Sequence, residues 1–569
     1  MPSSADQPGV PPSPGFAELY TPKLVTVLKE GYGLNELRAD ILAGLTVAIV
    51  ALPLSMAIAI ASGTSPDRGL YTAIIGGFLV SLLGGSRFQI GGPAGAFIVL
   101  VAGTVAQHGI DGLILATFIS GLLLAAAGFL RLGTYIKFIP YPVTVGFTAG
   151  IAVIIAVSQI KDLLGLPAGQ GDTGSLIEKL SAAVTALPEV SPAALLIAAL
   201  TIALILALKA FRPGWPGMLI AIAAASLLAF FAGLPVETIG TKFGGIARTL
   251  PLPALPDLSA PLFWAVLPNA FAFTLLGAIE SLLSAVVADG MTGRRHRSNC
   301  ELVAQGAANI GSALFGGMCV TGTIARTATN VRAGARGPVA GMCHALFLLA
   351  FMLIAAPLAS YIPLAALAGV LVLVAWNMIE KHAIAILVRT SPGDTLVLSA
   401  TFLFTVFRDL TEGIIIGFSI GTLIFLNRMA KSIRIEHHMP FVPEDKADWE
   451  NGTRAPYDAK LASDPGLVVY RISGAFFFGS ASTVAAVLDR IAERPQTLVL
   501  DFSDVPFLDS TAANTVESAL RKARASKARI FITGTSEPIR KALNAHGIKE
   551  PEISFAETVE AALKASRGA

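Results

Sequence analysis

Long apolar segments separated by short polar turns recur between residues 41 and 430 of the chain. A helix needs about 20 predominantly apolar residues to cross roughly 30 Å of hydrocarbon. Fourteen segments predict such helices: 41–61, 69–84, 92–108, 112–130, 143–161, 193–211, 216–234, 268–288, 302–318, 321–335, 338–357, 361–379, 394–408 and 412–430. The third and the tenth are notably short. Beyond Lys431 the pattern becomes polar and turn-rich, and then alternates between strand-like and helix-like segments, which predicts a soluble α/β domain.

Composition supports a polytopic α-helical membrane protein. Hydrophobic residues make up 54% of the 569 residues and charged residues 14%, whereas soluble domains carry about 25% charged residues. The net charge of +3 comes without a basic patch, which argues against a nucleic-acid partner. Cys300, Cys319 and Cys343 have no C-x-x-C spacing and are expected to be buried. Without a P-loop, a nucleophile–base constellation or metal-ligand spacing, we expect no enzyme, cofactor or metal.

The positions of Lys and Arg predict the orientation in the membrane. Cytoplasmic loops carry an excess of both residues. With the N-terminus inside, the inside-facing turns are the more basic, as at Arg294, Arg295 and Arg297. The outside loops 162–192 and 235–267 are Pro-rich and weakly basic. We therefore expect both termini in the cytoplasm, with residues 1–40 as a cytoplasmic N-terminal segment, 41–431 as the transmembrane domain, 432–465 as a linker and 466–569 as the soluble domain.

The two short segments predict the substrate site. Seven spans place the eighth in the opposite orientation to the first, so two inverted halves are possible, and interrupted spans at matching positions mark transporter sites. The third span opens with IGGPAGAFIVLV and the tenth with GGMCVTGTIARTATN. Two half-helix N-termini facing each other would attract an anion. Alternatively, the glycines only permit close helix packing. The candidate substrate-binding residues are Pro93, Ala94, Gly95, Ala96, Gly322, Thr323 and Arg326.

One acid, Glu280, lies in the middle of the apolar segment 268–288. A charge at the bilayer centre costs roughly 2.5–3.5 kcal/mol on insertion scales, so this side chain is expected to face a cavity, a partner or the substrate route. Ser284 follows at i+4 on the same helix face. A salt bridge from Glu280 to Arg326 is the structural alternative.

Several of these segments together resemble the SulP (sulfate permease) family of anion transporters. The resemblance rests on GLTVAIVALPLSMAIAIASG, GLYTAIIGG, GGSRFQIGGPAGAF, GFTAGIAVIIAVSQIKDLLGL and the Glu280 and Thr323 regions. LGAIESLL, DGMTG, ELVAQG and NVRAGA resemble the bacterial branch that includes an aerobic C4-dicarboxylate transporter. The C-terminal segment resembles the STAS domain of this family.

The resemblance implies seven-plus-seven inverted repeats in a bacterial inner-membrane protein. Spans 1–4 and 8–11 would form a core domain that moves like an elevator against a gate domain of spans 5–7 and 12–14, usually in a lipid-embedded homodimer. It also implies that Glu280, Ser284 and Arg326 match family site positions. This match makes Glu280 and Ser284 the candidate coupling residues, with Glu280 carrying a proton alongside the anion. Ser510 matches a serine that is phosphorylated in related free-standing STAS domains, although Asp509 or Ser510 could simply cap a helix. A cytoplasmic protein partner of the STAS domain is a further expectation.

Two departures from the family pattern affect the expected activity. Ile324 stands where a sodium-coupled bicarbonate branch has Thr, and Ala94 stands where many members have Thr. We therefore expect a secondary active, proton-coupled symporter of a sulfate-type inorganic anion or a C4-dicarboxylate. A sodium-coupled bicarbonate transporter and an anion exchanger or channel on the same scaffold are the alternatives.

Overall fold

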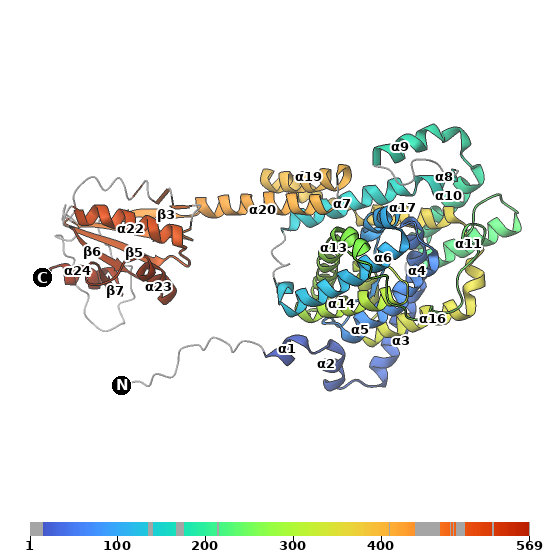
Figure 1. The fold of residues 1–569 in the computed structure, drawn as a ribbon, viewed down its shortest axis with the longest axis horizontal. Helices are drawn as coiled ribbons and strands as arrows, with labels where there is room; N and C mark the ends of the chain where they lie inside the picture. Colours follow the sequence, from blue (N-terminus) through green and yellow to red (C-terminus); the bar gives the residue numbers. More distant parts are fainter. Residues whose placement is uncertain are drawn as a thin grey trace. The chain divides into compact units, whose positions relative to one another are not determined.

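A computed structural model of the chain describes residues 15–134, 140–166, 176–212, 215–408, 410–438, 467–477, 480–481, 483–484, 487, 496–525 and 528–567 (Figure 1). The chain forms two compact units, Met1–Phe418 and Ser419–Ala569. The first is helical and the second is built on a β-sheet. Helix α20 (Leu410–Lys431) runs from one unit into the other.

The first unit consists of helices joined by short turns and two very short strands. Its elements are α1 (Phe16–Tyr20), α2 (Lys23–Lys29), α3 (Leu34–Ala61), α4 (Pro66–Tyr71), the π-helix η1 (Thr72–Gly76), α5 (Gly77–Leu83), β1 (Gly91–Gly92), the 3₁₀-helix η2 (Gly95–Phe97), α6 (Ile98–Phe129), η3 (Leu132–Thr134), α7 (Tyr141–Ser158), α8 (Ile160–Leu164), α9 (Leu176–Thr185), η5 (Leu187–Glu189), α10 (Pro192–Phe211), α11 (Gly217–Phe231), α12 (Ile239–Phe243), α13 (Ala260–Thr292), α14 (Ser298–Leu314), β2 (Thr321–Gly322), α15 (Ile324–Arg332), α16 (Val339–Ala359), α17 (Leu364–Met378), α18 (Lys381–Thr390) and α19 (Pro392–Phe407).

Each of the fourteen segments predicted from hydropathy overlaps a helix, although 92–108 begins in β1 and 321–335 begins in β2. Within the described residues, eight helical stretches are long and apolar enough to cross a membrane, and α11 and α19 are shorter apolar helices. The third and fourth predicted spans are joined in α6, where Gly109 interrupts the helical backbone with φ of 68°. The fourteen-span count therefore stays a prediction, while the polytopic helical architecture is confirmed.

The sequence sets several helix starts through Ser-Pro pairs. Ser191 precedes Pro192 and accepts a hydrogen bond from the backbone N–H of Ala194 at 3.3 Å, at the start of α10. Ser391 caps α19 in the same way, through the N–H of Asp394. Proline is favoured in the first turn because it has no N–H to leave unpaired. These pairs fix the residues at which α10 and α19 begin.

Two groups of helices form the first unit. In one group α3 packs on α16, and α6 packs on α13 and α14, with α15 between α13 and α3. In the other group α7 packs on α17 and α19, and α10 packs on α11 and α17. The first group contains the predicted spans 1–4 and 8–11, and the second contains spans 5–7, 12 and 13, as expected for these spans of the core and the gate. Helices α3 and α17 make one of the contacts between the groups.

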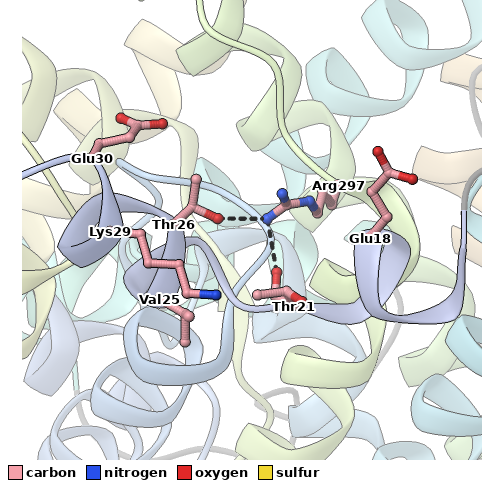
Figure 2. Close-up of a pocket in the computed structure, with 7 residues that line it drawn as sticks. All are labelled: Glu18, Thr21, Val25, Thr26, Lys29, Glu30 and Arg297. Atoms are coloured by element: carbon pink, nitrogen blue, oxygen red, sulfur yellow. Dashed lines mark hydrogen bonds between the residues drawn. The ribbon is translucent and has the colours of Figure 1, made fainter.

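Helices α1 and α2 pack on the core group. The Tyr20 hydroxyl donates to the carbonyl of Gly128 at 2.9 Å, and the N–H of Lys23 donates to Gly84 O at 2.9 Å. Arg297 Nη1 donates to Thr21 O at 2.8 Å and to Thr26 Oγ1 at 3.0 Å (Figure 2). A shallow pocket of about 490 Å³ lies there. These contacts hold α1 and α2 against the ends of α5 and α6 and the start of α14.

The second unit contains a five-stranded sheet in the order β3-β4-β5-β6-β7. Its strands are β3 (Arg434–His438), β4 (Leu467–Ser473), β5 (Thr497–Asp504), β6 (Arg529–Thr533) and β7 (Ser554–Ala556), and its helices include α22 (Ser510–Ala525), α23 (Glu537–Ala545) and α24 (Val559–Arg567). Strand β3 is antiparallel to β4, and the other pairs are parallel. The sheet thus begins inside the segment 432–465 that the sequence interpretation assigned to a linker, because β3 pairs with β4 over five residues. The rest of that segment lies outside the described residues.

Candidate functional site

Two short strands of the core group, β1 and β2, pair with each other, and their pairing is termed the strand crossing. Strand β1 pairs antiparallel with β2, with Gly91 opposite Gly322 and Gly92 opposite Thr321. The backbone N–H of Thr323 also donates to Ile90 O at 3.0 Å. Each strand leads directly into a helix, β1 into η2 and α6, and β2 into α15. The pairing therefore brings together the two half-helix starts that the sequence placed more than 200 residues apart.

Polar side chains from neighbouring helices satisfy the extended backbone before β2. The Asn309 amide on α14 donates to Val320 O at 2.9 Å and accepts from Val320 N at 2.9 Å. Thr72 Oγ1 accepts from Met318 N at 2.8 Å, and the Ser312 hydroxyl donates to Met318 O at 2.7 Å. Irregular backbone at membrane depth is tolerated where such partners exist. Sequence reasoning missed these residues, although an Asn in the apolar stretch AANIGSAL was an available signal.

Close approach of the Gln89 side chain requires glycine at Gly322. A methyl group there would overlap the Gln89 side chain. The Gln89 amide, two residues before β1, donates to Ser281 Oγ at 2.9 Å and to Ser281 O at 3.2 Å, which ties this segment to α13. The glycine therefore lets one side chain link the strand crossing to the helix that carries Glu280. This observation supports the packing reading of the glycine as well as the site reading.

The two half-helices begin without side-chain caps. Ala94 precedes η2 and Thr323 precedes α15, both with extended backbone angles, and neither side chain accepts a capping hydrogen bond. The first N–H groups of a helix have no partner within the helix. Gly95 and Ile324 are partly exposed and Ala325 is exposed, whereas Pro93, Ala94, Ala96 and Gly322 are buried. Access to the half-helix starts is therefore through Gly95, Ile324 and Ala325.

Gly95 faces the gate group. A methyl group at Gly95 would lie 3.3 Å from Ile155 Cδ1 on α7 and 3.9 Å from Met378 Sδ on α17. The start of η2 is thus at the boundary between the two helix groups. A ligand at this point would contact both.

Thr323 and Arg326 have different surroundings. The Thr323 hydroxyl donates to Ile90 O at 3.3 Å, so its hydrogen serves the strand crossing. The Arg326 side chain is 1% exposed, and its Nη2 donates to Ser55 Oγ at 3.1 Å and to Pro93 O at 3.2 Å. Its Nε and Nη1 are buried and have no hydrogen-bond partner among the described residues. A buried cation with unused donors is stabilised by an anion.

Glu280 is 7% exposed on α13, and no hydrogen bond or ion pair involves its carboxyl group within the described part of the chain. The alternative of a salt bridge from Glu280 to Arg326 is therefore absent from this conformation. Ser284 is fully buried and donates to Thr327 Oγ1 at 3.0 Å, and Thr327 Oγ1 in turn accepts from Ile90 N. The Ser284 hydroxyl is thus used in linking α13 to α15. The carboxyl group of Glu280 is not used in such a link.

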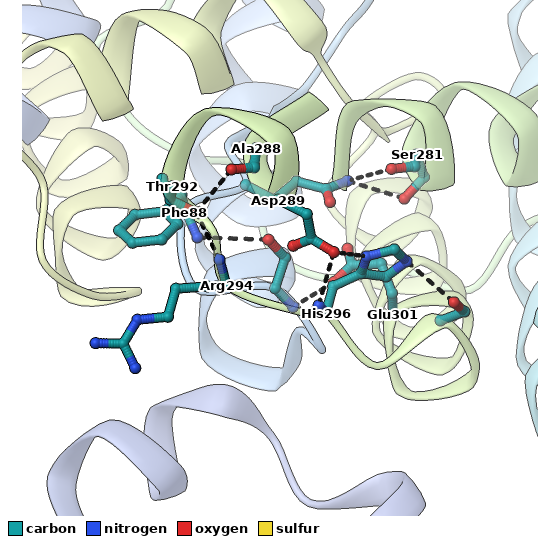
Figure 3. Close-up of polar contacts among 11 residues, drawn as sticks. Phe88, Ser281, Ala288, Asp289, Thr292, Arg294, His296 and Glu301 are labelled. Carbon is teal, nitrogen blue, oxygen red and sulfur yellow. Dashed lines mark hydrogen bonds and ion pairs between the residues drawn. The ribbon is translucent and has the colours of Figure 1, made fainter. Parts of the chain in front are cut away.

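The turn between α13 and α14 contains a chain of polar contacts (Figure 3). His296 Nδ1 lies 2.7 Å from Asp289 Oδ2, and His296 Nε2 lies 3.0 Å from Ser298 Oγ. The His296 N–H also donates to Asp289 Oδ2 at 3.0 Å. Since the backbone and the ring of His296 share one carboxylate oxygen, these contacts shape the turn. No group of three or more metal-ligating side chains occurs among the residues with described positions.

In the second unit, Ser510 is the exposed first residue of α22. The preceding Asp509 provides the cap, because its Oδ1 accepts from Ala512 N at 2.8 Å. Of the two capping residues considered from sequence, Asp509 is the one that caps. Ser510 keeps an exposed position at a helix N-terminus, where a phosphate would be tolerated.

The fold is that of a multi-pass membrane protein in which two half-helices start side by side. Residues 37–401 match the sulfate permease family, and residues 458–562 match the STAS domain. The chain therefore belongs to the sulfate permease family. Because its homologues are transporters, it is an anion transporter and not an enzyme.

Relatives and solved structures agree with this assignment. The "Putative sulfate transporter YvdB" of Bacillus subtilis is 38% identical over 522 residues, covering 91% of this chain and 95% of the relative. The "Bicarbonate transporter BicA" of Picosynechococcus is 30% identical, covering 90% of each. The transmembrane domain of a cyanobacterial BicA has a TM-score of 0.60 at 31% identity, covering 68% of this chain and 98% of that one. Murine Slc26a9 in its inward-facing state has a TM-score of 0.82 at 17% identity over 96% and 94%, a likeness of fold.

Proposed function

We propose that this protein is a proton-coupled secondary transporter that carries a small anion, with sulfate as the first candidate substrate. The observation that carries the proposal is the Arg326 guanidinium, which is buried beside the crossing strands with two unused donor nitrogens. The uncapped starts of η2 and α15 add partial positive charge at the same place. Pro93, Ala94, Gly95, Ala96, Gly322 and Thr323 form the backbone of this site.

The movement is elevator-like in this proposal, with the core group sliding against the gate group. Its support is the position of Gly95, whose surroundings include Ile155 and Met378 of the gate. An anion held at the half-helix starts would travel with the core and be released on the other side. A homodimer in the bacterial inner membrane, with both termini cytoplasmic, is part of the same proposal.

Glu280 is the proposed proton carrier. Its carboxyl group is buried without a hydrogen-bond or ion-pair partner among the described residues, so a negative charge there is uncompensated when the core moves. Ile324 supplies no oxygen ligand at the start of α15, which favours protons over sodium. A C4-dicarboxylate and bicarbonate remain alternative substrates, and the second of these is the substrate named for the BicA relatives.

The test is anion uptake into proteoliposomes against external pH, with labelled sulfate, succinate and bicarbonate in parallel. Wild-type uptake is expected to rise as the external pH falls, to require no sodium and to concentrate the anion against its gradient. Glu280→Gln is expected to remain folded and to lose most of the pH dependence. Glu237→Gln, a neutralisation at an exposed acid, serves as the matched control. An active Glu280→Gln variant with the wild-type pH profile would refute the assignment of the proton carrier.

The C-terminal unit is proposed to dock a cytoplasmic protein, with Ser510 as its phosphorylation site. Exposure of Ser510 at the start of α22 supports access by a kinase. Intact-mass measurement of protein purified from its native cells tests this role. A population without any phospho-form under all growth conditions would contradict it.

A further inference from the structure

His344 is a buried titratable residue that the proposed function does not use. It lies on α16, its side chain is 0% exposed, and neither ring nitrogen has a hydrogen-bond partner in the described part of the structure. A buried polar group without a partner costs about 1–3 kcal/mol. Because both ring nitrogens of His344 lack a partner, this cost applies twice. The imidazole is therefore a candidate for a group that changes its protonation state during the transport cycle.

The position of His344 connects it with the strand crossing. A methyl group at Gly77 on α5 would lie 3.9 Å from His344 Cε1 and 2.9 Å from the carbonyl oxygen of Gly91 in β1. A methyl group at Gly92 in β1 would overlap Arg326 Nη1 and lie 3.7 Å from the Cα of Ala73, which is one helical turn before Gly77. Ala73 and Gly77 therefore present one small-residue face to both Arg326 and His344. The imidazole therefore lies against Gly77 and the guanidinium against Gly92, on the stretch where η1 and α5 pack on β1.

Arg326 is the charged group that lies against the same η1–α5 stretch as His344. On α3, the Asp40 carboxylate accepts from the N–H groups of Arg336 and Gly337, and its field reaches Cys343. On α4, Arg68 donates to Gly316 O, and Asp67 lies beside Tyr71. The elements η1 and α5 carry no titratable side chain. On α15, Arg332 is exposed. On α16 itself, Cys343 is the titratable residue next to His344.

The charges of the buried groups can be balanced in both states of the cycle. In the empty site, the negative charge of an ionised Glu280 offsets the positive charge of Arg326, and a neutral His344 contributes no charge. When a dianion enters with a proton on Glu280, Arg326 offsets only one of its two charges. One further positive charge restores neutrality, and a proton on His344 supplies it. Moving a core with an unbalanced charge through the bilayer is costly, so the balanced states are favoured.

Resting on the proposed function, we propose that His344 is a second proton-binding site that lets the transporter carry divalent anions, with two protons carried for each dianion. Without the dianion, the neighbouring guanidinium opposes protonation of the imidazole because like charges repel. With the dianion bound, protonation is favoured, and by linkage the proton raises the affinity for the dianion by the same factor. A monovalent anion needs only the proton on Glu280.

The experiment counts protons per anion in proteoliposomes whose membrane potential is clamped with potassium and valinomycin. Labelled sulfate, with succinate as a second dianion, is the probe, and a trapped pH dye reports proton entry. The wild type is expected to carry two protons per dianion at a rate that does not change with potential. His344→Gln is expected to carry one, and its uptake should slow when the interior is negative. His382→Gln makes the same substitution at an exposed histidine on α18 and should behave as the wild type.

The outcomes separate this inference from the proposed function. If the wild type carries one proton per dianion, the second site does not exist, and this holds even if His344→Gln fails to fold. Bicarbonate uptake without uptake of either dianion would leave the proposed function standing and overturn the role of His344. A folded His344→Gln variant with two protons per dianion would also overturn it.

Discussion

A methyl group at Gly92 is the most direct perturbation of the anion site. It would overlap Arg326 Nη1 and lie 3.4 Å from Arg326 Cζ. The guanidinium cannot move aside freely, because it is 1% exposed and its Nη2 donates to Ser55 Oγ and Pro93 O. A hydrogen bond to a charged group contributes about 1.5–3 kcal/mol. Loss of one of them is thus enough to misplace the cation that the anion requires.

For Gly92→Ala we expect the KM for sulfate to rise at least about tenfold, since 1.4 kcal/mol corresponds to a factor of ten in affinity. Overpacking should also lower the free energy of unfolding by about 1–3 kcal/mol. Initial rates of sulfate uptake and a thermal unfolding curve measure the two effects. Gly103→Ala on α6 is the matched control, because a methyl group there meets no atom within 4 Å. Wild-type KM in Gly92→Ala would refute the placement of Arg326 against β1.

Substitutions at two further residues test the contacts that hold the site and the C-terminal unit. Asn309→Leu removes both hydrogen bonds to Val320 and should abolish uptake, while Asn309→Asp keeps the acceptor for the Val320 N–H and should retain partial activity; equal uptake by the two variants would contradict this reading. In the C-terminal unit, burial alone would raise the pKa of Asp501, but hydrogen bonds from Ser503 and Arg471 outweigh it and hold that pKa below its ordinary value. The contribution of Asp501 to stability is therefore present above about pH 4 and lost as the pH falls through the lowered pKa. Asp501→Asn should destabilise a 432–569 fragment at pH 7 by about 1.5–3 kcal/mol, with the difference from wild type shrinking below pH 4 in urea titrations followed by circular dichroism; a constant difference would count against it.

Helices α1 and α2 contact several elements of the core group. These helices bind at Gly84, Gly128 and Arg297, which lie at the ends of α5, α6 and the α13–α14 turn. All three positions belong to the core group. The N-terminal helices therefore join core elements to one another and would move with them.

The amino-acid sequence alone determined the membrane class, the positions of the helices and the two interrupted segments. These features are local, because an apolar run of sufficient length or a Gly-rich break has the same meaning wherever the chain folds. The strand–helix alternation of the C-terminal unit and the cap at Asp509 or Ser510 are local in the same sense. The motifs also sufficed to identify the family, which the matches over residues 37–401 and 458–562 confirm.

Only the tertiary structure decided which side chains meet. Glu280 and Arg326 were a reasonable pair from sequence, yet Arg326 turns to Ser55 and Pro93, and Ser284 is used by Thr327. Such partners come from helices far apart in the chain, so no spacing rule reveals them. The same reason hid β3, whose partner strand begins about thirty residues later. A buried polar group acquires its role from the elements packed around it, and that packing exists only in the folded chain.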